Sequence, residues 1–418
     1  MGLASKLFKG DRSIWIIFMF LCLVSLVEVY SATSTLTYRT AYYWTPIVRH
    51  ASFLLAGFAS VLVLSNIPSR FFSVAILFLP IAMILLIVTL YIGESTNEGA
   101  RWLTIFGISF QPSEIAKLTC IVFVAFMLSR QERITPNLTF WITILGIGLT
   151  CLFIFPENFS TAALLFLVCF LLLFVGQAQM KKMLLLLACL IVGAGLLYAS
   201  IRYVPKETLQ KHLPRLATWQ GRLEDFRTDK ATYKYEINDD NYQVNHAKIA
   251  IARGGLFGKL PGRSVQRDFL PQAYSDFIYA IIIEELGLIG GFVVLMLYVI
   301  LMFRVAIIAR RCERLFPKYL ALGCGLLIVI QAFVNMAVAV NLIPVTGQPL
   351  PLISRGGTSA IITSMYFGFI LSVSRFGAGM GDKDEVETVE APKALAEITE
   401  TDAEITQPNL KRQRTKES

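Results

Sequence analysis

Ten long apolar segments constrain the fold of this chain more than any other feature of its sequence. They lie near residues 14–29, 46–65, 72–92, 113–129, 137–155, 160–176, 183–200, 277–303, 319–343 and 356–374. Each is about as long as the roughly 17–25 residues that a helix needs to cross a bilayer. With 55% hydrophobic residues and a mean hydropathy of +0.62, the chain carries more apolar surface than one water-soluble core can bury. The sequence therefore predicts an all-α polytopic membrane protein with about ten transmembrane helices.

The lysine and arginine residues predict the orientation of these helices. They gather in the N-terminus and in alternate short loops, around residues 70, 130–133, 181–182 and 304–318. All of these basic segments fall on one side if the chain crosses ten times, and the positive-inside rule makes that side cytoplasmic. Residues 1–13 and the tail 376–418 are then both cytoplasmic. The tail is rich in Glu, Thr and Ala without apolar periodicity, and we expect it to be disordered.

The remaining organisation follows from these segments. Helices 1–7 occupy residues 14–200, a large extracytoplasmic loop occupies 201–276, and helices 8–10 occupy 277–375. From residue 202 to 276 there are 13 Lys or Arg and 9 Asp or Glu. This cationic excess suits an anionic ligand such as a phosphate or pyrophosphate, or lipid headgroups, while a flexible ectodomain loop is the plainer alternative. The net charge of +9 is explained by topology, and we expect no nucleic-acid partner.

Several ionisable residues lie where a bilayer makes a charge costly. Asp276 lies at the mouth of the eighth segment, and Glu284 is about 12 Å deeper and about 80° around the same helix. These two carboxylates are expected to line one cavity. In the fourth segment Glu114 and Lys117 are three residues apart, which predicts either a same-helix ion pair or part of a polar cavity. Intramembrane charges indicate function because stranding one in hydrocarbon costs at least about 2.5 kcal/mol.

The cysteine and histidine residues exclude some chemistries. The seven cysteines fall in apolar segments or in a short basic loop, so no disulfide framework is readable. The three histidines are widely spaced and have no cysteine neighbours, which argues against a His-rich metal site or a Ser-His-Asp triad.

Three longer motifs indicate a family. GARWLTIFGISFQPSEIAKL at 99–118, AIARGGLFGKLPGRSVQRDFLPQAYSDFIYAIIIEELGLIGG at 250–291 and NLIPVTGQPLPLISRGGTSAI at 341–361 follow one another in order. With these motifs the chain resembles the SEDS family (shape, elongation, division and sporulation), whose FtsW and RodA members polymerise peptidoglycan glycan strands from lipid II. The resemblance extends to about Arg375 and implies a bacterial inner-membrane protein.

The resemblance also implies roles for individual residues. Asp276, in YSDF, matches the essential acid of the family, and we expect it to be the general base. The residues expected to bind substrate are Arg101, Glu114, Lys117, Arg215, Glu284, Ser354, Thr358 and Ser359. Among these, Lys117 and Arg101, helped by Arg215, are assigned to the pyrophosphate. A divalent cation such as Mg²⁺ is an alternative or an addition to them, and the sequence leaves this choice open.

The chain departs from the family pattern at a few positions. Tyr274 stands where the family has His, and Arg355 stands where it has Tyr. The family's PDLGTA segment is ENFSTA here, with Asn158 for Asp and Ser160 for Gly. Any role of that acid therefore does not transfer to this chain.

The expected reaction is attack of the 4-hydroxyl of a GlcNAc on a sugar whose leaving group is polyprenyl pyrophosphate. A single displacement inverts the anomeric centre, turning an α-linked donor into a β-linked strand. A lipid II flippase, a secondary transporter and a non-catalytic scaffold of the wall-synthesis complex are the alternatives, although no repeated pair of broken helices favours a transporter. The long tail favours the division branch of the family over the elongation branch. The resemblance implies as partners a class B penicillin-binding protein, other division or elongation proteins, the growing glycan strand and membrane lipids.

Overall fold

The computed structural model describes residues 8–32, 45–92, 94–95, 100–105, 108–131, 135–203, 220–221, 242–270 and 273–377. Half of the predicted loop 201–276, including Arg215, lies outside these residues. The tail after residue 377 also lies outside them, so its predicted disorder stays a prediction.

Every predicted apolar segment coincides with helical structure. The helices are α2 (Arg12–Ala32), α4 (Thr45–Asn66), η1 (Ser69–Leu77) continuing as α5 (Phe78–Ile92), α6 (Pro112–Ser129), α7 (Pro136–Ile154), α8 (Phe159–Val175), α9 (Met180–Tyr203), α13 (Ile278–Arg311), α14 (Leu315–Ala339) and α15 (Thr358–Phe376). Within the described residues, eight helical spans are long and apolar enough to cross a membrane, and α8 is a shorter apolar helix of 17 residues. The all-α polytopic architecture is confirmed, and the number of ten crossings stays a prediction.

Local sequence signals define where several helices begin. Pro112 opens α6 and Pro136 opens α7, at positions where the missing amide hydrogen has no helical partner to lose. Asn158 caps α8, because its side-chain oxygen accepts a hydrogen bond of 3.2 Å from the amide of Thr161. The residue that replaces the family's Asp in ENFSTA therefore has a structural use here.

Short elements at one end of the bundle were not predicted. Strands β1 (Glu94–Ser95), β2 (Ala100–Ile105) and β3 (Ile108–Phe110) form a small antiparallel sheet in the order β1-β2-β3. Thr104 lies opposite Ser109, and their hydroxyl oxygens are 3.0 Å apart. Helix α12 (Tyr242–Gly254) and the short η2 (Gln266–Asp268) belong to the segment before α13.

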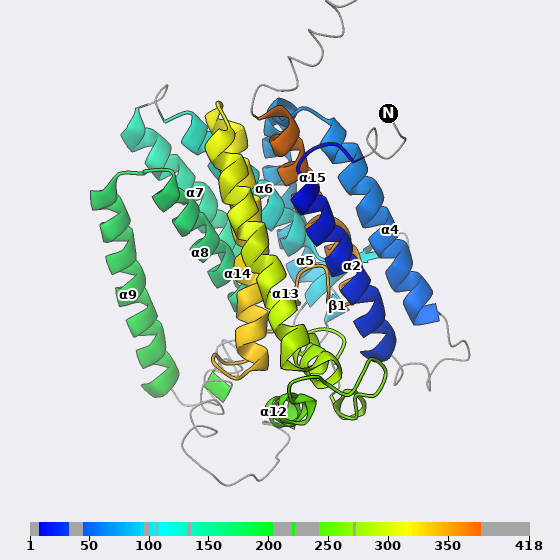
Figure 1. Cartoon of the computed structure of the whole chain (residues 1–418). Helices are drawn as coiled ribbons and strands as arrows, with labels where there is room; N and C mark the ends of the chain where they lie inside the picture. Colours follow the sequence, from blue (N-terminus) through cyan, green and yellow to red (C-terminus); the bar gives the residue numbers. More distant parts are fainter. Residues whose placement is uncertain are drawn as a thin grey trace, which may run out of the picture.

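The helices divide into an interior set and an outer set. Helices α6, α14 and α15 bury most of their residues, whereas the spans that contain α4, α5 and α7 bury a third or less of theirs, as lipid-facing helices do. Helix α14 packs against α13, α6, α15 and α8, and α15 packs along α4. Figure 1 shows α9 standing at the side of the bundle away from α2 and α4.

The two ends of the described chain meet at one end of the bundle. The Asp11 amide donates to the Ser374 hydroxyl at 2.9 Å, and Arg304 forms an ion pair with Asp11. The amide of Glu313, just beyond α13, donates to the carbonyl of Gly377. Helix α12 lies beyond the opposite end of the bundle (Figure 1). Because α12 packs against α13, and Arg304 of α13 pairs with Asp11, α13 runs from the α12 end of the bundle to the end where Asp11 and Ser374 meet.

Candidate active site

Asp276 lies two residues before α13, the helix against which α12 packs. Its side chain is half-buried, and the Ser275 hydroxyl donates to its Oδ1 at 3.0 Å. The side-chain amide of Asn335, on α14, donates to the Asp276 carbonyl at 2.9 Å. A Cβ at Gly347 would lie 3.6 Å from Asp276 Oδ2, so the loop before α15 approaches the carboxylate closely. The backbone that carries the carboxylate is thus hydrogen-bonded to α14, while the residue stays partly exposed.

The loop between α14 and α15 is irregular backbone held by side chains from several helices. Its carbonyl groups accept hydrogen bonds from Ser25 on α2, at Ile353, and from the Tyr298 hydroxyl on α13, at Pro351. The Gln348 side chain donates to the Thr161 hydroxyl on α8 at 2.8 Å. Irregular backbone that is buried requires such partners, because an unpaired amide or carbonyl away from water is costly. These bonds therefore fix the loop that faces Asp276.

Ser354 fastens this loop directly to the Asp276 segment. Its hydroxyl donates to the Ser275 carbonyl at 2.6 Å and accepts from the Leu350 amide at 2.8 Å, and the residue is buried. The predicted substrate ligand Ser354 is therefore brought next to Asp276, with its hydroxyl engaged in holding the backbone. Its assignment to substrate binding stays a prediction.

Glu114 and Lys117 form the same-helix ion pair that was one of the two predictions. Glu114 Oε1 lies 2.7 Å from Lys117 Nζ, and the Lys117 side chain is fully buried. Lys117 also donates to Gln331 Oε1 at 3.2 Å, and Gln331 donates to the Pro349 carbonyl at 3.0 Å. Polar contacts therefore connect the pair to the loop that faces Asp276. Within the described residues the ammonium of Lys117 is already bonded on two sides, and its predicted contact with a pyrophosphate stays a prediction.

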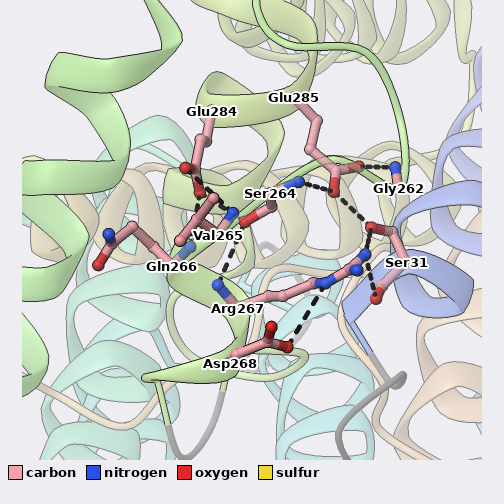
Figure 2. Close-up of polar contacts among 9 residues, drawn as sticks. All are labelled: Ser31, Gly262, Ser264, Val265, Gln266, Arg267, Asp268, Glu284 and Glu285. Carbon is pink, nitrogen blue, oxygen red and sulfur yellow. Dashed lines mark hydrogen bonds and ion pairs between the residues drawn. The ribbon is translucent and has the colours of Figure 1, made fainter.

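Glu284 is completely buried and is bonded to the glycine-rich segment before Asp276, as Figure 2 shows. Its carboxylate accepts from the Ser264 hydroxyl and from the amides of Val265 and Gln266, at 3.3 and 3.2 Å. Lys259 Nζ lies 3.4 Å from Glu284 Oε1. The sequence placed Glu284 in one cavity with Asp276, but these described contacts are all with residues 259–266. Its assignment to substrate binding stays a prediction.

Glu285, the next residue, ties the same segment to the first helix. Its carboxylate accepts from the amides of Gly262, at 3.0 Å, and Ser264, at 3.2 Å, and from the Ser31 hydroxyl at the end of α2. Arg267 donates to the carbonyl and the hydroxyl of Ser31, at 3.2 and 3.0 Å (Figure 2). The two neighbouring carboxylates therefore act as anchors for the segment that leads into Asp276.

Helix α13 is interrupted at Gly287, two residues after Glu285. Gly287 has φ +73° and ψ −179°, a conformation that is essentially restricted to glycine. At this break the amides of Lys259 and Leu260 donate to the carbonyls of Glu284 and Glu285, at 3.0 and 2.8 Å. The segment 255–260 thus bonds to the helix backbone where the helix is interrupted.

Tyr274 and Arg355, the two departures closest to Asp276, contact each other. The Arg355 amide donates to the Tyr274 carbonyl at 2.9 Å, and Arg355 Cζ lies 5.3 Å from the centroid of the Tyr274 ring. Burial lowers the pKa of Arg355 from its usual value; Tyr274 opposes this shift and the charge of Arg49 adds to it. The sequence identified both departures but could not show that they meet.

Other predicted residues are placed less completely. Thr358 opens α15, and its hydroxyl donates to the Ser109 carbonyl of β3 at 3.4 Å, while Ser359 follows it in the first turn. Arg101 lies in β2, but its side chain is outside the described part of the structure. Within the described residues no group of three His, Cys, Asp or Glu side chains is arranged to hold a metal ion.

Sequence reasoning missed Gln331 and Asn335. These two amides lie four residues apart in an otherwise apolar helix, so both project from one face of α14 toward the site. Polar residues with helical spacing inside an apolar segment were the signal that could have found them.

The fold and the site together define a class: a helical membrane protein with a half-buried carboxylate held at one end of its bundle. Residues 11–378 match the FtsW/RodA/SpoVE family of cell cycle proteins, and the chain belongs to this family. The chain is 32% identical over 362 residues to a probable peptidoglycan glycosyltransferase FtsW of Nitrosococcus halophilus, covering 84% of this chain and 87% of that one. It is 31% identical over 379 residues to a probable peptidoglycan glycosyltransferase FtsW of Haemophilus influenzae, covering 87% and 90%.

Solved structures agree with the fold. The chain superimposes on RodA of Thermus thermophilus with a TM-score of 0.60 at 24% identity, covering 89% of this chain and 99% of that one. It superimposes with a TM-score of 0.65 at 21% identity on a chain from a peptidoglycan synthase complex that coordinates polymerization and crosslinking, covering 88% and 98%. At these identities the likeness establishes the fold.

Proposed function

We propose that this chain is a peptidoglycan glycosyltransferase that polymerises lipid II into glycan strands at the outer face of the bacterial cytoplasmic membrane, in cell division. The two relatives described above carry the name probable peptidoglycan glycosyltransferase FtsW, which supports the activity. The matched family is described as one of cell cycle proteins, which supports a role in division. The observation that carries the proposal is the placement of Asp276, half-buried and held between the start of α13 and the loop before α15.

In the proposed reaction Asp276 removes the proton from the attacking 4-hydroxyl of the acceptor sugar. The oxygen then bonds to the anomeric carbon of the donor, and the bond to polyprenyl pyrophosphate breaks. The carboxylate suits this role because the Ser275 hydroxyl and the Asn335 amide fix its position. Positioning of this kind lets a general base act in the transition state without reorganisation.

The orientation and the partner belong to the same proposal. The basic residues after Arg304 lie at the end of α13 where Asp11 pairs with Arg304, opposite Asp276. The positive-inside rule then supports Asp276 facing outward and both termini facing the cytoplasm. A class B penicillin-binding protein is the proposed partner, because a neighbour in fold belongs to a complex that coordinates polymerization and crosslinking.

The test is polymerisation of labelled lipid II by the purified full-length chain, alone and with its transpeptidase. Asp276→Asn keeps the side-chain volume but removes the base, and we expect product to fall by about 10² to 10⁴. Asp268→Asn is the matched control, because it makes the same chemical change at an exposed carboxylate eight residues earlier, and it should retain activity.

The outcomes separate the alternatives. Near-wild-type polymer from folded Asp276→Asn protein contradicts the base assignment. If the wild-type protein makes no polymer but moves lipid II across vesicle membranes, the flippase is correct. If it does neither and still stimulates its partner, the scaffold is correct.

A further inference from the structure

Arg355 is a positively charged residue fixed beside the candidate base. Its own amide is bonded to Tyr274, two residues before Asp276, and its neighbour Ser354 is bonded to the carbonyl of Ser275. The segments 274–276 and 354–355 are therefore joined at consecutive residues. The backbone of Arg355 is thus fixed close to that of Asp276, the residue that is proposed to activate the acceptor.

Among the described residues no carboxylate forms an ion pair with Arg355. The ion pairs of these residues use Lys117, Lys259, Arg267 and Arg304. The guanidinium is half-buried. A guanidinium does not give up its proton in proteins, so this site holds a partly desolvated positive charge that an anion would stabilise.

Tyr274 gives this cation a defined orientation. A ring centroid 5.3 Å from Arg355 Cζ is within the range of a cation–π contact. A planar guanidinium held in this way keeps its N–H donors in a fixed fork, and this geometry matches the oxygens of phosphate. Lys117, by contrast, is fully buried and already bonded to Glu114 and Gln331.

We propose that Arg355, oriented by the ring of Tyr274, binds the diphosphate of the polyprenyl-linked sugar beside Asp276. The inference rests on the proposed function and names the residue that holds the leaving group. Positive charge at this position stabilises the pyrophosphate as its bond to the sugar breaks. Tyr274 acts as a positioning residue for Arg355.

The first experiment measures KM and kcat for labelled lipid II with the full-length protein and its transpeptidase in nanodiscs. Arg355→Gln removes the charge and should raise KM about tenfold or more, the effect of losing a charge-assisted hydrogen bond. Arg355→Lys keeps the charge without the planar fork, and its KM should fall between those of the wild type and Arg355→Gln. Tyr274→Leu, which removes the ring, should raise KM. Tyr274→Phe, which keeps the ring, should have a KM close to the wild-type value.

Arg49→Gln is the matched control, because it removes an exposed cation near Arg355 that contacts the Phe53 ring. We expect it to leave KM within about twofold of wild type. Equal effects of Arg49→Gln and Arg355→Gln would mean that only the general potential matters, and would overturn the inference. An unchanged KM in folded Arg355→Gln protein would overturn it as well.

Two further arms identify the anion and separate this inference from the proposed function. The KM effect should persist in nanodiscs of zwitterionic lipid alone; its disappearance there would assign Arg355 to anionic phospholipid headgroups and overturn the inference. Binding of a fluorescent polyprenyl pyrophosphate, which needs no turnover, should weaken about tenfold in Arg355→Gln protein. If the wild-type protein is inactive but Arg355→Gln still weakens binding, the proposed function alone is contradicted. If the wild-type protein is active but Arg355→Gln does not weaken binding, the inference alone is contradicted.

Discussion

At the scale of single residues, Glu114 and Lys117 show how a buried charge is kept in this bundle. The ion pair and Gln331 satisfy the ammonium, and Gln331 passes the connection on to the loop before α15. Removing one member of a buried pair leaves the other charge uncompensated, whereas replacing both by apolar residues is often neutral. The pair therefore offers a way to separate a structural role from the substrate-binding role that the sequence predicts.

We expect Lys117→Met alone to lower the free energy of unfolding by about 3–5 kcal/mol. The double variant Lys117→Met with Glu114→Met should recover most of this loss, as measured by thermal unfolding in detergent. Polymerisation by the folded double variant then decides the role of the pair. Retained activity supports a structural pair, and lost activity with normal folding supports direct action on the substrate.

At the residue scale the sequence predicted the acid but not its surroundings. Asp276 was identified because a carboxylate at the mouth of an apolar segment is costly and because it matches a family motif. Its contacts with Asn335 and the approach of Gly347 could not be predicted, since they join residues that are about 60 or more positions apart in the chain. Only the packing of α13 against α14 brings them together.

At the scale of elements, the interruption of α13 at Gly287 is the feature on which the anchoring of the glycine-rich segment depends. A side chain at Gly287 would place its Cβ 2.2 Å from the Leu256 carbonyl oxygen and would also strain the backbone. The steric clash and the backbone strain would both disturb the place where segment 255–260 contacts α13. The spanning helices were predicted from apolar length alone, but this break was not, because its conformation depends on contacts with a segment about 30 residues away.

We expect Gly287→Ala to lower stability by at least about 1–3 kcal/mol, the usual cost of a strained backbone conformation. The measurement is the thermal unfolding midpoint of the purified protein. Gly148→Ala on α7 is the matched control: nothing lies within 4 Å of its added Cβ, so the midpoint should hold or rise. Equal midpoints for the two variants would show that the break is not needed for folding.

At the scale of the whole molecule, the proposed orientation follows from the alternation of basic loops. A reporter that is active only outside the cytoplasm should work when fused within residues 205–265. The same reporter should fail when fused after Arg130, after Lys182 or at the C-terminus. Activity after Lys182 would contradict the ten-span topology, while the helices described here would stand.

Helix α15, the last described helix, packs against segments from the beginning of the chain. Helix α15 packs along α4, and Ser374 at its end receives the Asp11 amide that precedes α2. During synthesis, α4 therefore enters the bilayer long before α15 has left the ribosome. Gly57 on α4 is the small residue that lets Ser364 on α15 approach closely, and this contact forms only when α15 arrives. Packing of α15 against α4 is therefore a late step, which follows insertion of the early helices. Until that step the early helices depend on lipid or on the insertion machinery to cover the surface that α15 will occupy.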